Sequence, residues 1–207
     1  NFVHLHTHSQ YSLLDGACRI DNAVAMAKEF GMPAVAITDH GNVFGAIEFY
    51  QKASKAGVKP IIGIEAYVAG GSRLDKQPSS KYPDGGFHLV LLAKNQKGWQ
   101  NLIKLASFGY TEGFYHRPRI DKQLLREHSE GLIASSACLK GEVNWRLLKG
   151  DVEGAVATAR ELSEIFGEGN FYLEIQNHGI EQEELILPKI EAISRETGIP
   201  LLATNDC

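Results

Sequence analysis

The sequence predicts an α/β fold in the form of a distorted, seven-stranded (β/α)7 barrel. Short apolar runs alternate with amphipathic helical stretches along the 207 residues, a pattern typical of strands joined by crossover helices. A glycine followed by a proline precedes an apolar run at 31–33, 57–60 and 198–200, as expected where a helix ends and a strand begins. Seven such units in a chain of this length favour a closed sheet over an open one. A doubly wound open sheet is the alternative.

The strands are expected where five to nine mostly apolar residues run together between turn-forming residues. In chain order they are 2–6, 34–38, 60–68, 87–93, 131–135, 171–176 and 200–204. The helices are expected where apolar residues recur every three to four positions. In chain order they are 21–30, 43–56, 97–110, 140–148, 152–166 and 182–197, with a shorter helix near 121–127. The segments 70–86 and 113–119 interrupt this alternation and are expected to be loops.

Composition excludes several classes of protein. With 21 Lys and Arg against 25 Asp and Glu, the net charge of −4 does not suit a protein that binds nucleic acid through its overall charge. The apolar runs are shorter than the ~20 residues of a membrane helix, so no membrane association is expected. Three scattered cysteines and the lack of a secretory leader pattern favour a reducing, cytoplasmic location. A start at Asn1 and an end at Cys207 suggest a piece of a longer chain.

Potential metal ligands follow the expected strands. His6 and His8 follow the first strand, His40 the second, Cys138 the fifth and Asp206 the last. Side chains at the carboxyl ends of barrel strands converge on one mouth, which can gather ligands remote in sequence. Imidazole with carboxylate suits Zn²⁺, Mn²⁺ or Fe²⁺. Glu65 interrupts an apolar strand, where an unpartnered carboxylate would be costly.

Structural roles compete with metal binding at several of these positions. Residues i and i+2 of an extended segment point to the same side, so His6 and His8 can share one ion. Cys138 alone suits a small buried side chain, and Asp39 suits a helix cap as well as a role behind the ligands. His88 does not fit the predicted topology, because it begins its strand instead of ending it.

Three segments carry a resemblance to a known family: HLHTHSQYSLLDGA from position 4, AITDHGNVFGAIEFY from position 36 and KPIIGIEAYVA from position 59. They closely resemble the PHP domain of bacterial DNA polymerase III alpha subunits, and later segments continue the likeness over the whole chain. The resemblance implies a seven-stranded βα barrel with two or three divalent ions, zinc, manganese or iron. The ligands that it implies here are His6, His8, Asp15, His40, Glu65, His88, Cys138 and Asp206.

The resemblance also implies a function. The chain, 1–207, would be one PHP domain at the start of a much longer replicative polymerase, and a metal-dependent 3′–5′ exonuclease with His6, His8, His40 and Asp206 as catalytic residues. Its expected partners are a single-stranded DNA 3′ end, the rest of the polymerase chain and other replicase subunits. A non-catalytic scaffold and a phosphatase of the histidinol-phosphatase type are the alternatives.

Substrate-binding residues are also expected. Arg117, Arg119 and Lys122 suit the phosphates of a DNA strand, and Phe114 or Tyr115 suits stacking on a base, although a solvated loop would explain the same residues. His178 matches a segment that recurs in the family and is expected beside the site. The family's last motif, Asp-x-His, would place a further histidine at position 208.

Overall fold

A computed structural model describes residues 2–13, 15–77, 82–83 and 85–207 of the chain. The strands are β1 Ala34–Ile37, β2 Lys59–Val68, β3 Phe87–Ala93, β4 Arg119–Ile120, β5 Leu132–Ser135, β6 Phe171–Ile175 and β7 Leu201–Ala203. The helices are α1 Ile20–Glu29, α2 Ala46–Ala56, α3 Gln96–Thr111, α4 Lys122–His128, α5 Glu142–Leu148, α6 Val152–Phe166 and α7 Glu181–Thr197. Among these residues, no helix has the length and apolar character needed to cross a membrane.

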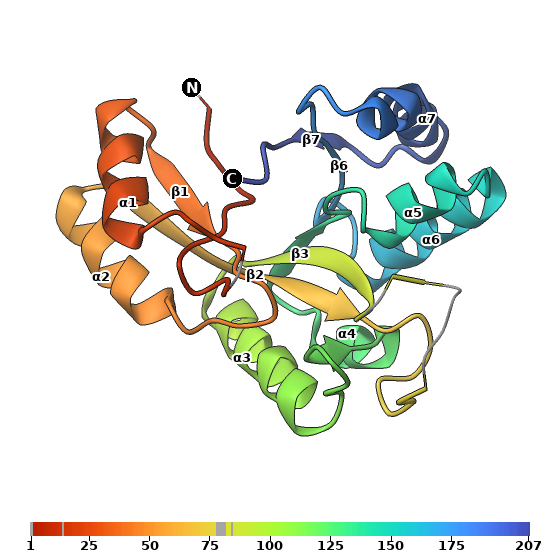
Figure 1. Ribbon diagram of the computed structural model, residues 1–207, viewed down its shortest axis with the longest axis horizontal. Coiled ribbons are helices and arrows are strands. Elements are labelled where there is room, and N and C mark those ends of the chain that lie inside the picture. Colours follow the sequence, from red (N-terminus) through yellow and green to blue (C-terminus); the bar gives the residue numbers. More distant parts are fainter. Residues whose placement is uncertain (1, 14, 78–81, 84) are drawn as a thin grey trace.

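The strands form one mixed sheet in the order β1-β2-β3-β5-β6-β7, with β4 paired to β2. The sheet curls into a half-barrel, with α1 and α2 at one end and α5, α6 and α7 at the other (Figure 1). Neighbouring strands are parallel except at β3, which runs antiparallel to both β2 and β5. The predicted α/β barrel class is confirmed, with a sheet that is not uniformly parallel.

The alternation of side chains shows which face of the sheet the helices cover. Val35 and Ile37 of β1 pack with apolar residues of α1 and α2, and Leu89 and Leu91 of β3 pack with those of α3 to α7. The intervening Ala36 and Val90 point to the opposite face, where they form a separate small cluster. Within the described ranges the helices therefore cover the outer face of the curled sheet, as in a barrel and unlike a doubly wound sheet.

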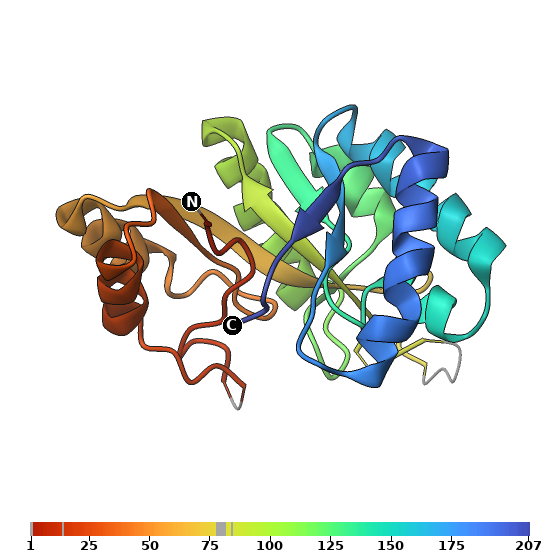
Figure 2. The same ribbon diagram turned by 90° about the horizontal axis from the view of Figure 1, so that it is seen from above.

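The expected strand at 2–6 is wrong. No strand is assigned there, yet the segment lies in the gap between the two edges of the sheet, beside the C-terminus (Figure 2). On one side the carbonyls of His4 and Thr7 accept from the amides of Ala36 and Thr38, at 2.9 and 2.8 Å. On the other side the amide of His8 donates to the carbonyl of Cys207 at 2.6 Å. Only scattered bonds form, which explains the absence of a regular ladder.

Helix ends follow the predicted signals. Gly57 and Gly198 end α2 and α7 in the left-handed conformation, which glycine adopts at little cost. Asn95, Asp121 and Asp151 each accept a hydrogen bond from an amide in the first turn of the helix that they precede. The start of α2 differs from its prediction by three residues, and the other helix boundaries differ by two or fewer, as is common at frayed ends.

The two segments that interrupt the alternation of strands and helices, 70–86 and 113–119, match the expected loops only in part. The segment 113–119 is mostly irregular but ends in the two-residue strand β4, which was not predicted. Within the expected loop 70–86, residues 78–81 and 84 lie outside the described residues. The described part of this loop is anchored by Arg73, which donates to Asp121 and Glu112.

Candidate metal centre

Seven of the eight predicted ligands form three overlapping groups within the half-barrel. In each group one potential ligand atom per residue lies within 4.8 Å of the others: His6, His8 and Asp206; His8, His40 and Glu65; Glu65, His88 and Cys138. His8 and Glu65 are each shared between two groups. The eighth residue, Asp15, contacts the middle group through His40, with 2.5 Å between Oδ2 and Nε2. Ions held by neighbouring groups would therefore have a residue in common, as in sites that hold more than one metal ion.

Glu65 lies at the centre of the site. It is fully buried in β2, and its Oε1 is 2.8 Å from Nδ1 of His88 and 3.3 Å from Nε2 of His6. Burial alone raises the pKa of this carboxyl group, but the surrounding histidines outweigh burial and hold the pKa well below its usual value. The lowered pKa favours the charged carboxylate, the form that a metal ligand requires.

His6 is oriented by Glu174, a residue that the sequence analysis missed. Its Nδ1 lies 2.7 Å from Oε1 of Glu174, so Nδ1–H donates to the carboxylate and Nε2 faces the ligand groups. Ser135 and Thr204 also donate to Glu174, from β5 and beside β7. Burial lowers the pKa of His6, but the charges of Glu174 and Glu65 outweigh it and raise the pKa well above its usual value. The sequence contains a signal that could have identified Glu174: it is a glutamate within the apolar run FYLEI, just as Glu65 is a glutamate within an apolar strand.

His8 is oriented through a hydroxyl group. Ser12 Oγ donates to Asp39 Oδ1 at 2.9 Å, so it accepts from Nδ1–H of His8 at 3.0 Å. The tautomer assigned by this network leaves Nε2 of His8 as an acceptor toward the ligand groups. Asp39 also accepts from the amide of Ser9 at 2.6 Å. Two roles were predicted for Asp39, a helix cap and support of the ligands. The structure shows the second, because Asp39 holds the loop that carries His8.

The fit to a metal is tested by two buried atoms. Nδ1 of His40 and Oε2 of Glu65 lie 2.6 Å apart, but neither has a hydrogen-bond partner among the described residues. Buried polar atoms are seldom left unpartnered. Each of these atoms can serve as a metal ligand, and the Nε2 atoms of His6 and His8 lie nearby, 3.3 Å from each other and 3.3 and 3.4 Å from the carboxylate oxygens of Glu65. The residues thus fit a cluster of cations held by nitrogen, oxygen and sulfur ligands.

The antiparallel direction of β3 resolves the position of His88. Because β3 runs opposite to its neighbours, its beginning lies at the edge of the sheet where parallel strands end, and His88 reaches Glu65. Cys138 Sγ lies 3.6 Å from Nδ1 of His88. Burial, helped by the charge of Glu65, raises the pKa of the Cys138 thiol well above its usual value. A thiolate ligand at this position therefore requires a bound cation to form.

Strained backbone is concentrated at the site. In the described part of the chain the non-glycine residues with positive φ are His116, Ala137 and Asp206, at 59°, 56° and 46°. Asp206 belongs to the first ligand group, and Ala137 precedes Cys138. Such conformations cost about 1–3 kcal/mol each and persist where the surroundings enforce them. Burial raises the pKa of Asp206, but His8 and His6 outweigh it and lower the pKa below its usual value.

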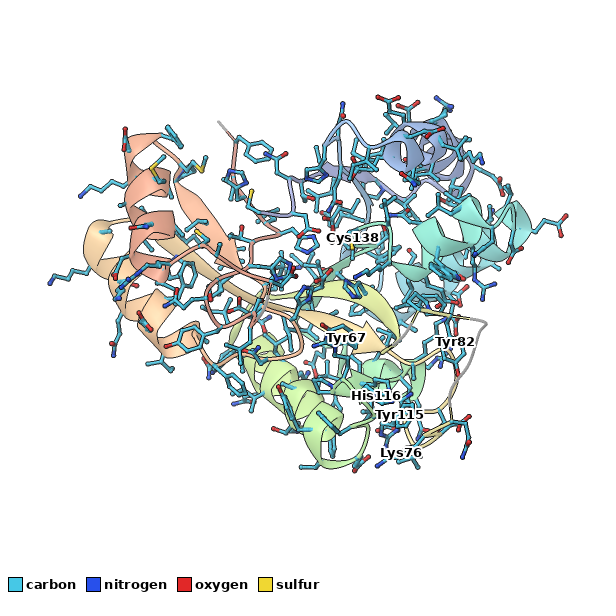
Figure 3. All side chains as sticks on the ribbon, viewed as in Figure 1. Tyr67, Lys76, Tyr82, Tyr115, His116 and Cys138 are labelled. Carbon is cyan, nitrogen blue, oxygen red and sulfur yellow. The ribbon has the colours of Figure 1, made fainter. Side chains whose placement is uncertain are left out.

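Of the predicted substrate-binding residues, Arg117 faces an open cavity of about 430 Å³ that Asp15, His40 and His88 also line. Its guanidinium lies 5.7 Å from the ring centre of Tyr67. In the view of Figure 3, Tyr67 lies between Cys138 and the loop with Tyr115 and His116. Burial raises the pKa of Tyr67 to about 12, so its hydroxyl stays protonated.

The expected phosphate contact of Arg119 is wrong. Its side chain is buried and donates to the carbonyls of Gly113, Arg73 and Asp75, which holds two loops together. Lys122 likewise pairs with Glu142 and Glu161 on neighbouring helices.

His178 lies beside the site without joining a ligand group. Its Nδ1 is 2.7 Å from Glu183 and its Nε2 is 2.5 Å from the carbonyl of Asn205, the residue before Asp206. Hydrogen bonds to Glu183 and to that carbonyl raise the pKa of His178. Its position supports the C-terminal segment that carries Asp206.

Comparison with known proteins gives close sequence relatives. The chain matches the PHP domain family over residues 4–178. It is 50% identical to a DNA polymerase III subunit alpha of Borreliella burgdorferi and 49% identical to that of Thermus aquaticus, each over 99% of the chain. The chain spans only 18% and 17% of the length of these relatives.

Solved structures share the fold at low sequence identity. A candidate metal-dependent phosphoesterase from Bifidobacterium adolescentis aligns with a TM-score of 0.57 and 14% identity, over 99% of this chain and 86% of that one. A two-domain protein from Bacteroides vulgatus, which contains a predicted PHP-like metal-dependent phosphoesterase, gives a TM-score of 0.57 and 16% identity, over 99% of this chain and 51% of that one. Sequence and fold agree: the chain belongs to the PHP domain family and is homologous to the N-terminal region of DNA polymerase III alpha subunits.

Proposed function

We propose that this PHP domain is a metal-dependent phosphodiesterase that removes nucleotides from the 3′ end of single-stranded DNA, as a proofreading exonuclease within a replicative polymerase. The observation that carries the proposal is the row of three ligand groups joined by His8 and Glu65. Bound divalent ions, two or three of zinc, manganese or iron, would supply an activated water and neutralise charge on the phosphate. A row of several metal sites suits this reaction better than a single site does, because the attacking oxygen and the leaving oxygen both need stabilisation.

The residues around the row would hold and orient the reacting groups. His6, His8, His40 and Asp206 would hold the ions that act on the phosphodiester, with His6 and His8 fixed in orientation by Glu174 and Ser12. Arg117 and Lys140 line the adjoining cavity and would bind the phosphates of the strand. The exposed Asp15 at the cavity wall would close the site on its solvent side.

The test is cleavage of 5′-labelled single-stranded DNA by the full-length protein with Mn²⁺ or Zn²⁺. We expect products shortened stepwise from the 3′ end, and a loss of at least about 100-fold in rate for His8→Ala and Asp206→Asn. His128→Ala is the matched control, because His128 packs on Phe108 away from the ligand groups. Thermal melting of each variant separates lost chemistry from lost folding.

Two other results would replace the proposal. Stoichiometric metal binding with no cleavage of DNA or of phosphate monoesters would support a structural scaffold. The candidate ligands come from both ends of the chain, so bound ions would hold these ends together, as a scaffold role requires. Hydrolysis of small monoesters alone supports a phosphatase of the histidinol-phosphatase type. In the polymerase, the rest of the chain and other replicase subunits would be the domain's partners.

A further inference from the structure

A second feature of the site is the aromatic wall of the cavity beside the ligand groups. The cavity is lined by Asp15, His40 and His88 of the candidate site. It is also lined by Phe44, Tyr110 and Phe114, which we call the aromatic wall. A volume of about 430 Å³ falls within the range of small-ligand pockets. One cavity thus combines the proposed ions with an aromatic surface.

The rings of the aromatic wall come from two segments remote in sequence and remain exposed. Phe44 precedes α2, Tyr110 lies in the last turn of α3 and Phe114 follows α3, with exposed fractions of 64%, 42% and 48%. The ring centres of Tyr110 and Phe114 are 6.2 Å apart with an angle of 24° between the planes. Those of Phe44 and Tyr110 are 6.1 Å apart. The three rings form one continuous surface that is accessible to a ligand.

Local hydrogen bonds fix the position of this surface. The side chain of Asn42 accepts from the amide of Phe44 at 3.0 Å and donates to the carbonyls of Tyr11 and His40. Phe44 is therefore connected to the loop that carries the ligand His40. Because both ends of the Asn42 amide are used in this way, Asn42 has little capacity left to read the edge of a base.

Cations line the same cavity as the candidate ligands and the aromatic wall. Arg117 and Lys140 both line the cavity, and the guanidinium of Arg117 is held over Tyr67. A ligand that suits this lining has a phosphate for the ions and the cations, and an aromatic ring for the wall. A nucleotide has this form, and its ring is free to stack only when the base is unpaired.

We propose that the aromatic wall binds the unpaired base of the 3′-terminal nucleotide by stacking, with little preference among the four bases. This inference rests on the proposed function and adds the basis of substrate choice. Stacking gives affinity to every base because each has a π-face. A terminal nucleotide that is paired in a duplex keeps its base in the helix, so the wall would favour frayed or mismatched ends.

The experiment compares two strands that differ only in the last residue. One 5′-labelled strand ends in dT, and the other ends in a tetrahydrofuran abasic residue. In the full-length protein with Mn²⁺, we expect the dT end to be removed roughly 10- to 100-fold faster, in line with the contribution of one stacked base. Phe44→Ala combined with Phe114→Ala is expected to slow removal of dT by a similar factor and to leave removal of the abasic residue nearly unchanged.

Phe30→Ala provides a matched control, because Phe30 is an exposed phenylalanine, 62% accessible, at the end of α1 and outside the cavity. It is expected to change neither rate. Equal losses on both strands in the double variant would overturn the inference and leave the proposed function intact. Failure of the unchanged protein to shorten either strand would count against the proposed function instead.

A binding measurement tests the inference without cleavage. A strand with 2-aminopurine at its 3′ end loses fluorescence when that base stacks. Quenching by the unchanged protein and by Phe30→Ala, but not by the double variant, supports stacking on the wall. Quenching of the same size in all three proteins overturns it, even if no strand is cleaved.

Discussion

At the scale of single residues, the candidate site includes side chains that orient the candidate ligands as well as the candidate ligands themselves. Glu174 is fully buried and receives hydrogen bonds from His6, Ser135 and Thr204. Burial raises the pKa of Glu174, but His6 and these hydroxyls outweigh burial and lower the pKa below its usual value. A charged carboxylate behind a histidine raises the basicity of the nitrogen that faces the metal.

We expect Glu174→Gln to weaken Mn²⁺ or Zn²⁺ binding by about 10- to 100-fold, because the amide keeps the size of the side chain and removes its charge. Isothermal titration calorimetry of the full-length protein measures the affinity. Glu142→Gln is the matched control, since Glu142 is also buried but pairs with Lys122 and Arg146 and belongs to no ligand group. Equal affinity in the unchanged protein and Glu174→Gln would contradict this role.

At the scale of elements, Asp121 connects the start of α4 to the preceding loops. It accepts from the amides of Leu124 and Arg73, at 3.0 and 2.9 Å, and pairs with the guanidinium of Arg73. Burial raises the pKa of Asp121, but these donors outweigh burial and lower the pKa below its usual value. The ionised form is thus stabilised by folding.

The sign of the pH dependence follows from this lowered pKa. The stabilisation is fully present above the unfolded pKa of about 4 and is lost as the pH falls through the lower folded pKa. We expect Asp121→Asn, which keeps a cap acceptor, to be less stable than the unchanged protein at pH 7, with the difference shrinking below pH ~4. Urea denaturation between pH 7 and pH 3 measures this difference. A constant difference over that range would show that ionisation of Asp121 does not matter.

Helix α3 contains a glycine, Gly98, at a point where its backbone lies too close to a neighbouring segment for a larger residue. A Cβ added at Gly98 would lie 1.8 Å from the carbonyl oxygen of Gly131, just before β5. Glycine to alanine in a helix normally stabilises by up to about 1 kcal/mol. Here we expect Gly98→Ala to destabilise the protein by about 1–3 kcal/mol, because the backbone must move apart. Thermal denaturation provides the test, and a raised midpoint would disprove the tight contact.

At the scale of the whole molecule, the candidate ligands join the two ends of the described chain. His6 and His8 come from the segment beside β1, and Asp206 comes from the segment after β7. The remaining ligands come from the loops and strands between these edges. Ions bound here would therefore connect both edges of the half-barrel, which few hydrogen bonds connect otherwise.

Removal of metal is accordingly expected to lower thermal stability. At a free ion concentration of 100 times the dissociation constant, binding to the folded state adds about 2.7 kcal/mol. We expect the midpoint for unfolding of this domain to fall by several degrees after treatment with a chelator, and to recover when Mn²⁺ or Zn²⁺ is added. Differential scanning calorimetry measures both steps. Asp206→Asn should reduce the recovery. An unfolding midpoint that does not change with metal would show that bound ions do not hold the two edges of the half-barrel together.

The sequence by itself determined the α/β alternation, most element boundaries and the set of candidate ligands. These features are local: a period of two or of 3.6 residues, a glycine at a helix end, or a costly glutamate in an apolar strand leaves its mark within a few residues. The resemblance of the motifs around His6, His40 and Glu65 added the ligand set, which spacing alone left open.

Tertiary structure decided the rest. The antiparallel direction of β3, which brings His88 to Glu65, depends on pairing with strands far along the chain. So does the irregular course of residues 2–6, whose backbone bonds are shared between the two edges of the sheet. Glu174 acquired its role, and Arg119 lost its expected one, through contacts with segments remote in sequence. Such contacts are set by how the curled sheet closes, which no short stretch of residues specifies.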